Sequence, residues 1–500
     1  MSASSAAIAN GPQQAERFDV LIVGAGISGI GSAYHLAQQC KDRSFVLLET
    51  MESFGGTWHT HRYPGTRSDS DLYTFGYRFK PWTEAPIATR ARILGYVGGV
   101  IAENDLERHI RYRHKVLSAS WSSGTKSWTV VAERTDTGAT LYFEANFLWM
   151  CQGYYRHCEG YTPEWPGMAD FKGPIVHPQT WPEDLDYRNK RVVVIGSGAT
   201  AATLVPALAD DCAHVTMLQR SPTYFNPGTN ADALADQLRA LDIDEHWIHT
   251  IVRKKLLKDQ NERVRRSLDE PETVAREMIA SVREHLGPGV DVEKHFTPKY
   301  RPWQQRVAFI PDGDFFKPFV AGKAAVETGE IDRFVENGIR LKSGEVLEAD
   351  IVITATGFRL SVLGDIEFTI DGRKLDLAET VTYHGMMFTG VPNLAWVFGY
   401  FRASWTLRVE LVADFICRLF KHMDAIGARK VTVELTPEDR EMPLLPWIDP
   451  ENFSPNYLMR DIHLMPKRGD KPEWQHTQDY YSEKDRFPLI SLEGAAFRFE

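Results

Sequence analysis

The sequence predicts an α/β protein in which one strand–turn–helix unit occurs twice and a helical segment is inserted. A short apolar run at residues 18–23 leads into a glycine-rich turn and then into small and apolar residues at helical spacing. Residues 191–195 lead into a second glycine-rich turn of the same kind. Residues 231–287 are rich in Ala, Leu, Glu, Arg and Lys, which favours helices. The duplication predicts two domains of similar architecture.

Length and composition indicate a globular protein with more than one domain. The chain has 500 residues, of which 43% are hydrophobic and 25% charged, and this balance excludes a disordered or fibrous chain. A net charge of −10 argues against a nucleic-acid partner, which requires a basic surface. The five cysteines have neither metal-ligand nor redox-motif spacing. We therefore predict no metal site and a reducing compartment, the cytoplasm.

The start of the chain lacks the pattern of a secretory signal, and residues 1–15 are expected to be a disordered tail. No stretch approaches the ~18 uninterrupted apolar residues of a membrane-spanning helix. We therefore expect no integral membrane segment.

The first glycine-rich turn has the pattern of a dinucleotide site. Gly24 permits the tight turn, Gly26 lets the backbone approach a pyrophosphate, and Gly29 allows close packing of helix and strand. Glu49 ends the next predicted strand, where a carboxylate accepts hydrogen bonds from the ribose of an adenine nucleotide. This site should prefer FAD or NAD, and an ordinary loop is the alternative interpretation.

The strands that follow alternate with Gly, Ser and Thr turns. They are predicted at residues 116–121, 128–133 and 140–144, and a buried strand is predicted at 147–151.

The second turn differs from the first in a way that indicates another nucleotide. It keeps Gly196 and Gly198 but has Ala201 at the third position, which is a tolerated variant. Where the first unit has Glu49, this one has Gln219 followed by Arg220. A guanidinium binds a 2′-phosphate that a carboxylate would repel, so the second site should prefer NADPH. The alternative for Arg220 is a solvated surface arginine.

Three later segments complete the pattern. The basic run at residues 253–258 is interpreted as a solvated helix face, with peripheral contact to an anionic membrane surface as the alternative. A strand with a glycine stop is predicted at 349–357 and a helix at 405–423. The last fifty residues are rich in Pro and aromatic residues and are expected to wrap an existing surface.

These elements predict a discontinuous first domain. Residues 16–165 and 325–500 are expected to form the FAD-binding domain, and residues 166–324 the NADP-binding domain with a helical insert at about 231–290. The fold class is therefore two Rossmann-like dinucleotide-binding domains with a helical insertion.

Two dinucleotides in one chain indicate a resident flavin that a nicotinamide reduces. A disulfide reductase would need a redox-active cysteine pair near the start, but Cys40 is the only cysteine before Cys151. The sequence therefore favours a flavoprotein that passes electrons to oxygen or to another acceptor.

A family resemblance narrows this chemistry. Residues 171–181, FKGPIVHPQTW, resemble the Phe-x-Gly-x-x-x-His-x-x-x-Trp fingerprint of Baeyer–Villiger monooxygenases and lie between the two turns, as in that family. Related heteroatom-oxidising flavin monooxygenases usually have Tyr or Phe where Trp181 stands. Further stretches resemble the family at residues 55–58, 62–69 and 350–357, and the ethionamide-monooxygenase-like subgroup at 219–224, 310–314 and 403–407.

The resemblance implies an enzyme that uses FAD, NADPH and O2. NADPH reduces FAD, oxygen adds to give a C4a-peroxyflavin, and attack on a ketone yields an ester or lactone, with sulfide oxidation as a side activity. Three alternatives stay open: a flavin monooxygenase that hydroxylates nitrogen or sulfur, a reductase or NADPH oxidase without oxygenation, and a non-enzymatic nucleotide-binding module. The substrate and the oligomeric state do not follow from the sequence.

The resemblance also implies catalytic residues. Arg306 aligns with the family's catalytic arginine, and Asp69 would hold it in place. Gln305 stands where many members have Lys, so that supporting charge is missing or supplied elsewhere. Taken without the motifs, Arg306 could be half of a structural ion pair and Asp69 a turn or capping carboxylate.

The remaining assignments concern cofactor contacts and the hinge. His177 and Trp181 are interpreted as a linker that couples domain rotation to cofactor binding, or as a packed hinge. Ser404 and Trp405 are expected near the flavin or substrate, or at a helix start. The predicted cofactor-binding residues are Gly24, Gly26, Ser28, Gly29, Glu49, Thr57, Trp58, His59, Thr60 and Val116 for FAD, Arg67, Ser68 and Asp69 where NADP reaches the flavin, and Gly196, Ser197, Gly198, Ala199, Thr200, Ala201, Ala202, Gln219 and Arg220 for NADPH.

Overall fold

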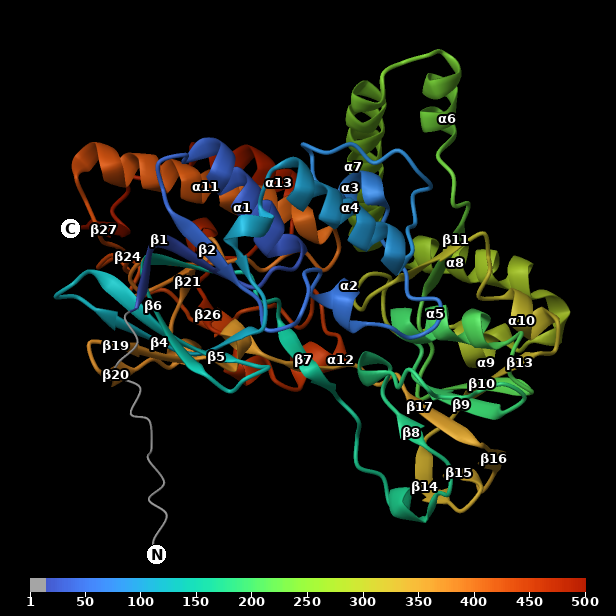
Figure 1. Cartoon of the computed structure of the whole chain (residues 1–500). Coiled ribbons are helices and arrows are strands. Elements are labelled where there is room, and N and C mark those ends of the chain that lie inside the picture. Colours follow the sequence, from blue (N-terminus) through green and yellow to red (C-terminus); the bar gives the residue numbers. More distant parts are fainter. Residues whose placement is uncertain (1–14) are drawn as a thin grey trace, which may run out of the picture.

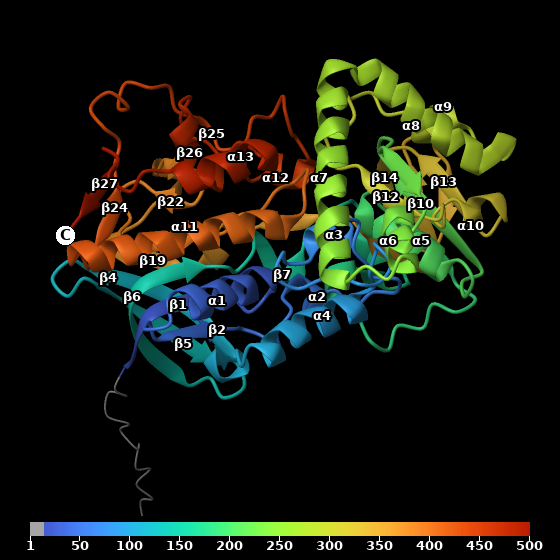
Figure 2. The ribbon, with the colours of Figure 1, turned by 90° about the horizontal axis from the view of Figure 1, so that it is seen from above.

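The structure, a computed structural model, describes residues 15–500, so the tail expected at residues 1–15 lies outside the described residues except for its last position. Two sheet-based units lie side by side, and a group of helices stands over the junction between them (Figures 1 and 2). The chain crosses between the units twice, through β7 (Tyr155–Gly160) and β18 (Phe358–Leu360), which pair antiparallel.

The first unit is built on a nine-stranded sheet with a parallel half and an antiparallel half. In the parallel half, β1 (Glu16–Val23) lies between β2 (Phe45–Leu48) and β6 (Thr140–Met150). The long strand β6 also pairs with β5 in the antiparallel half, which joins the two halves. The other strands are β3 (Ile110–Arg111), β4 (His114–Ser122), β5 (Ser127–Arg134), β19 (Glu367–Ile370), β20 (Arg373–Lys374) and β23 (Leu394–Trp396).

Helices cover one face of this sheet and share an apolar core with it. Helix α1 (Ile27–Gln39) packs against α11 (Trp405–Ile426), which begins at the residue expected for it. The C-terminal residues wrap the first unit, as their composition predicts, and β24 (Val431–Val433) pairs with β27 (Phe497–Phe499) near the end of the chain. The other helices here are α2 (Thr57–Thr60), α3 (Leu72–Phe75), α4 (Arg90–Glu103), α12 (Asn456–Met459) and α13 (Tyr480–Arg486).

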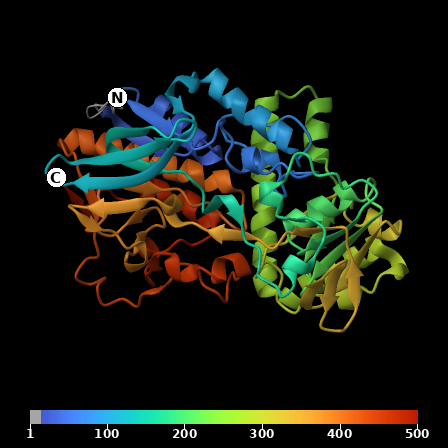
Figure 3. The ribbon, with the colours of Figure 1, turned by 60° about the horizontal axis from the view of Figure 1, so that its bottom comes forward.

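The second unit is a parallel five-stranded sheet (Figure 3). Its order is β13 (Ala324–Thr328), β10 (His214–Gln219), β9 (Arg191–Ile195), β17 (Ile351–Thr354) and β8 (Ile175–Val176). Helix α5 (Ala199–Leu208) follows β9, and a meander of β14 (Ile331–Val335), β15 (Gly338–Leu341) and β16 (Val346–Glu348) lies between β13 and β17. Two dinucleotide-type sheets in one chain confirm the predicted fold class.

The pairing differs from the domain boundary expected at residue 325. Strands β13 and β17 belong to the second sheet, although residues 325–354 were assigned to the first domain. Short apolar strands look alike in either sheet, so their pairing could not be read from the sequence. We propose that the second unit extends to about Gly357, where β18 returns the chain to the first.

The inserted helices do not stand free of the first unit. They are α6 (Ala233–Ala240), α7 (Glu245–Asp269) and α8 (Pro271–Leu286). Arg253, expected on a solvated face, is buried instead, because its guanidinium donates to the carbonyl oxygens of Tyr73 and Gly76 at 2.7 Å and pairs with Glu410 at 3.1 Å. Lys254 and Lys258 are exposed as expected.

The remaining elements complete the connections. They are β11 (Phe225–Gly228), α9 (Val292–Phe296), β12 (Ala308–Pro311), α10 (Lys317–Val320), β21 (Thr382–Tyr383), β22 (Met387–Phe388), β25 (Leu445–Pro446) and β26 (Lys467–Arg468). Among residues 15–500, no helix combines the length and the apolar composition needed to cross a bilayer.

Candidate active site

One cavity of about 1740 Å³ lies between the two units, and both glycine-rich turns open into it. Its walls come from the first turn, the second turn, the crossing strands and the C-terminal segment around Tyr457. A pocket for one drug-sized ligand measures roughly 300–1,000 Å³, so this cavity has room for more than one such ligand.

The first turn leaves no room for a side chain at Gly24 or at Gly29. Gly24 has φ +98°, and a Cβ there would lie 2.8 Å from the carbonyl oxygen of Cys151. A Cβ on Gly29 would lie 1.9 Å from the carbonyl oxygen of Gly24. Helix α1 begins after Gly26 with no side-chain cap, so its first amide groups are available to an anionic group in the cavity.

Glu49 reinforces the same turn from the neighbouring strand. One carboxylate oxygen accepts from the amide of Ala25 at 2.8 Å and the other from the amide of Met51 at 2.9 Å. Burial raises the pKa of the carboxyl, although these backbone hydrogen bonds oppose the shift. Glu49 lines the cavity, where the ribose of an adenine nucleotide would meet it.

The second turn is tight at its first glycine and open at its second. A Cβ on Gly196 would lie 2.3 Å from the carbonyl oxygen of Ala355, but a Cβ on Gly198 would meet nothing within 4 Å. Gln219 is held by hydrogen bonds from its amide nitrogen to the carbonyl oxygen of His295 at 2.6 Å and to Thr328 Oγ1 at 3.0 Å. Arg220 lines the cavity, is exposed, and forms no ion pair within residues 15–500.

Asp69 and Arg306 meet across the cavity although 237 residues separate them in the chain. Arg306 donates from Nε to one carboxylate oxygen at 2.8 Å and from Nη2 to the other at 2.7 Å. Burial would raise the pKa of Asp69, but the charge of Arg306 and its hydrogen bonds prevail and lower it. The charge of Asp69 in turn raises the pKa of Arg306. The pair is therefore ionised, with a fixed positive charge at the cavity wall.

Most predicted site residues line this cavity. They are Gly24, Gly26, Ser28, Glu49, Thr57, Trp58, Thr60, Arg67, Ser68, Asp69, Val116, Gly196, Ser197, Gly198, Ala199, Thr200, Gln219, Arg220 and Arg306. Arg67 forms a two-pronged ion pair with Asp314, so part of its charge is neutralised before any nucleotide binds. Gln305, which takes the place of a lysine, also lines the cavity.

Four predicted cofactor residues do not line the cavity: Gly29, His59, Ala201 and Ala202. Gly29 lies behind the first turn, where it serves packing. The ring of His59 points to Glu52, with a hydrogen bond of 2.9 Å. Ala201 and Ala202 lie on the core side of α5, because consecutive helical positions cannot all face one ligand.

The residues predicted for the hinge are packed, and those at the start of α11 form hydrogen bonds with the first unit. His177 Nε2 lies 3.1 Å from the carbonyl oxygen of Gly357, and a Cβ on Gly160 would meet its ring, so His177 packs between the two crossing strands. Trp181 packs beside Tyr187 at the core of the second unit. Trp405 lines the cavity and donates to Ser28 Oγ at 2.8 Å, whereas Ser404 precedes α11 and hydrogen-bonds Thr74.

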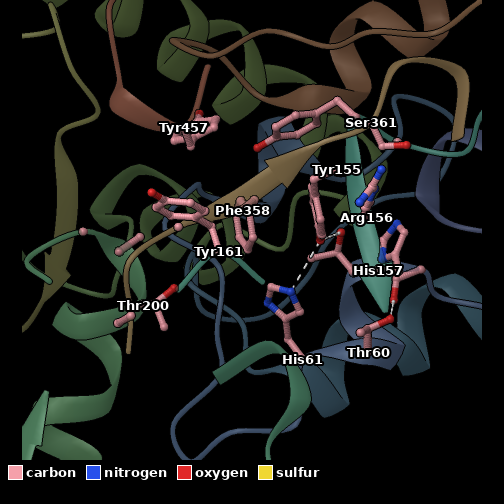
Figure 4. Close-up of a pocket in the computed structure, with 18 of the residues that line it drawn as sticks. Thr60, His61, Tyr155, Arg156, His157, Tyr161, Thr200, Phe358, Ser361 and Tyr457 are labelled. Carbon is pink, nitrogen blue, oxygen red and sulfur yellow. Dashed lines mark hydrogen bonds between the residues drawn. The ribbon is translucent and has the colours of Figure 1, made fainter. Parts of the chain in front are cut away.

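Four further polar residues line the cavity and were not predicted: His61, Tyr155, His157 and Tyr457. Tyr155 Oη lies 3.5 Å from His61 Nε2 (Figure 4). It also lies 2.6 Å from Oγ1 of Thr57, which was predicted. Burial lowers the pKa of His61 to about 3 and that of His157 to about 4, so both rings are neutral at pH 7. Tyr457 approaches from the C-terminal segment. His61 stands beside the predicted residues 57–60, but nothing local marks Tyr155 or Tyr457.

The site as a whole defines a protein that binds two dinucleotides, because two uncapped helix N-termini in one cavity suit two pyrophosphates. Sequence comparison agrees. Residues 22–82 match the NAD(P)-binding Rossmann-like domain, and residues 81–229 match the flavin-binding monooxygenase-like family.

Whole-chain relatives extend these matches. The FAD-containing monooxygenase EthA of Mycobacterium tuberculosis (strain H37Rv) is 47% identical over 93% of this chain and 94% of its own length. The probable FAD-binding monooxygenase AlmA of Acinetobacter baylyi is 42% identical over 97% and 96%. The chain therefore belongs to the FAD-containing monooxygenases, which confirms the predicted resemblance, and its cofactors are FAD and an NAD(P)-type nucleotide.

Solved structures share the fold at lower identity. An oxidized steroid monooxygenase bound to NADP superposes with a TM-score of 0.75 at 23% identity and covers 97% of this chain and 99% of its own. The monooxygenase OTEMO in complex with FAD and NADP gives a TM-score of 0.76 at 20% identity, with 97% and 100% covered.

Proposed function

We propose that this NADPH-dependent flavin monooxygenase inserts one oxygen atom of O2 next to a ketone carbonyl to give an ester or a lactone, and oxidises sulfides as a side activity. The observation that carries the proposal is the two-pronged Asp69–Arg306 pair at the cavity wall. When bound and reduced by NADPH, FAD supplies the activated oxygen.

The chain's own groups suit an addition to a carbonyl. As a nucleophile adds to a ketone, negative charge develops on the carbonyl oxygen, and a preorganised cation stabilises that charge. Asp69 engages Nε and Nη2 of Arg306, so Nη1 has no hydrogen-bond partner within residues 15–500. That edge is available to the oxygen. The aromatic rings of Tyr154, Trp405 and Tyr457 line the same cavity, which limits the access of water to the charged groups.

The test is a product panel with Arg306→Ala. Loss of one preorganised charge typically lowers a rate about 10²–10³-fold, so we expect ester formation to fall by at least 100-fold. Oxidation of a sulfide places no oxyanion on the substrate, so the yield of sulfoxide should fall by less than about tenfold. The FAD content per chain should stay the same, because the hydrogen bonds of Arg306 go to Asp69 and not to the first turn.

The control is Arg333→Ala, which removes an exposed arginine that pairs with Asp170 outside the cavity. It should leave both products unchanged. An unaltered ester yield in Arg306→Ala would remove Arg306 from the proposed role. Sulfoxide or N-oxide without any ester from the wild-type enzyme would instead favour a heteroatom-oxidising monooxygenase, and NADPH consumption without either product would indicate an oxidase.

A further inference from the structure

We propose that the outer face of helix α7, together with the α6–α7 turn, docks the enzyme on an anionic lipid surface. The turn projects beyond both units (Figure 1), and α7 lies across the top of the molecule over its whole length (Figure 2). The residues of this face do not line the cavity that holds Asp69 and Arg306, and the inference does not depend on the proposed reaction.

The projecting end of this face is apolar. Leu241 in the turn is 71% exposed and Trp247 in the first turns of α7 is 60% exposed, and Ile243 and Ile251 are exposed beside them. Large apolar side chains gathered at a protruding end mark an interaction site rather than ordinary surface. Tryptophan in particular prefers the boundary between lipid headgroups and acyl chains.

The rest of the face is basic. Trp247, Ile251, Lys254, Lys258 and Arg265 follow one another at spacings of four, three, four and seven residues, which places them on one side of a helix. All five are exposed, whereas Ile248, Val252 and Ser267 on the opposite side are buried. Apolar residues with long basic side chains on one helix face are typical of interfacial binding, because the basic groups reach the headgroups.

Acidic residues nearby offset only part of this charge. Asp244 caps α7 by accepting from the amide of His246 at 2.9 Å, and Asp259 pairs with Lys255 at 2.8 Å. Asp242 and Glu262 are exposed at the edges of the face, and Asp269, four residues after Arg265, is exposed at its far end. Lys254 and Lys258 form no ion pair within residues 15–500, so their charges are available to anionic headgroups.

A lipid surface fits this face better than a second copy of the chain. The four apolar side chains expose on the order of a few hundred Å², whereas a stable dimer buries about 1,200–2,000 Å² in total. The face is also a protruding ridge, which a fluid interface can accommodate but a rigid partner would have to match. The chain's net charge of −10 means that the basic ridge, not the whole body, would face the lipid.

The experiment is co-sedimentation of the FAD-loaded enzyme with vesicles. We expect binding to an equal mixture of phosphatidylcholine and phosphatidylglycerol, little binding to phosphatidylcholine alone, and weakening with added salt. Trp247→Ser should lower the partition coefficient at least tenfold. Lys254→Ser with Lys258→Ser should lower it about 25-fold, since each basic residue near such a surface contributes roughly fivefold.

Matched controls distinguish binding through this face from nonspecific binding to vesicles. Leu489→Ser removes another strongly exposed apolar side chain, and Lys41→Ser with Lys172→Ser removes two exposed lysines elsewhere. These variants should bind like the wild type, and all variants should keep the FAD absorbance and the rate of NADPH oxidation. The proposal is overturned if the wild type does not bind anionic vesicles, or if the α7 variants bind them as strongly as the wild type does. It is also overturned if Trp247→Ser abolishes self-association in the absence of lipid, which would assign the face to a second copy.

Discussion

The two glycine-rich turns are built alike but packed differently. In the first turn, added methyl groups on Gly24 and Gly29 would meet backbone atoms at 2.8 and 1.9 Å, and Glu49 is buried with both oxygens bonded to amides. In the second, a methyl group on Gly196 would also meet a backbone oxygen, at 2.3 Å, but the third position holds Ala201, Gly198 has open space around it and Arg220 is exposed. A turn braced by a buried acid suits a cofactor that stays bound, and the more open turn suits one that arrives and leaves.

The largest expected effect is that of Gly29→Ala. Its Cβ would lie 1.9 Å from a backbone oxygen, so strand and helix would have to separate and the first turn would lose its shape. We expect little folded protein and no bound FAD, measured as absorbance at 450 nm, roughly the flavin maximum, per chain. Gly198→Ala adds the same methyl group to the second turn, at a position where a Cβ would meet nothing within 4 Å. It should leave FAD in place and weaken NADPH binding only. Normal FAD content in Gly29→Ala would mean that the first turn tolerates a methyl group at this position.

The next effect concerns the open turn. Arg220→Ala should raise the KM for NADPH by roughly 10–100-fold, because a hydrogen bond between charged groups contributes about 1.5–3 kcal/mol. The KM for NADH should stay the same, since NADH lacks the 2′-phosphate that the guanidinium would bind. Steady-state kinetics with both nucleotides measure the ratio, and Arg373→Ala, an exposed arginine on β20, is the control. An unchanged ratio would mean that Arg220 is only a surface residue.

The sequence was sufficient where the chemistry is local. A strand, a glycine-rich turn and a helix follow one another within about thirty residues, so both dinucleotide folds could be predicted from periodicity and glycine spacing. The Asp69–Arg306 pair was predicted from family motifs, since no local pattern connects two residues that lie 237 positions apart in the chain. The link from Thr57 to Tyr155 spans 98 residues and depends on how the crossing strand lies over the cavity. The sequence does not indicate to which sheet β13 and β17 belong, because these strands can be assigned only through their pairing with β10 and β9, and the boundary proposed here therefore differs from the predicted one at residue 325.

The buried ring of His61 should make the stability of the protein depend on pH. Burial lowers the pKa of His61 to about 3, while an unfolded chain has a histidine pKa of about 6.5. Below pH 6.5 the unfolded state therefore binds a proton that the folded state does not, so stability falls as the pH drops towards 3.

His61→Gln removes this contribution. At pH 5.5 it should reduce the acid-dependent loss of unfolding free energy by about 1.4 kcal/mol relative to the wild type, measured against each protein's own value at pH 7.5. His214→Gln, the same substitution at a half-buried histidine on β10 of the second unit, is the control for the change of residue type. Identical pH profiles for the wild type and His61→Gln would mean that the ring is not held neutral.

The smallest effect tests whether the third position of the second turn carries any cofactor function. Ala201 is fully buried in the core of the second unit and does not line the cavity, unlike the glycines of its own turn. Ala201→Gly should lower the unfolding free energy by about 1 kcal/mol, because glycine is a poor residue in a helix. The KM for NADPH should stay within about twofold, since a stability change of this size leaves almost all of the chain folded. Gly29 and Ala201 stand at equivalent positions of the two turns. A methyl group at position 29 would clash with the backbone, whereas the methyl group of Ala201 stabilises the helix. A large rise in KM would show that the third position shapes the nucleotide site after all.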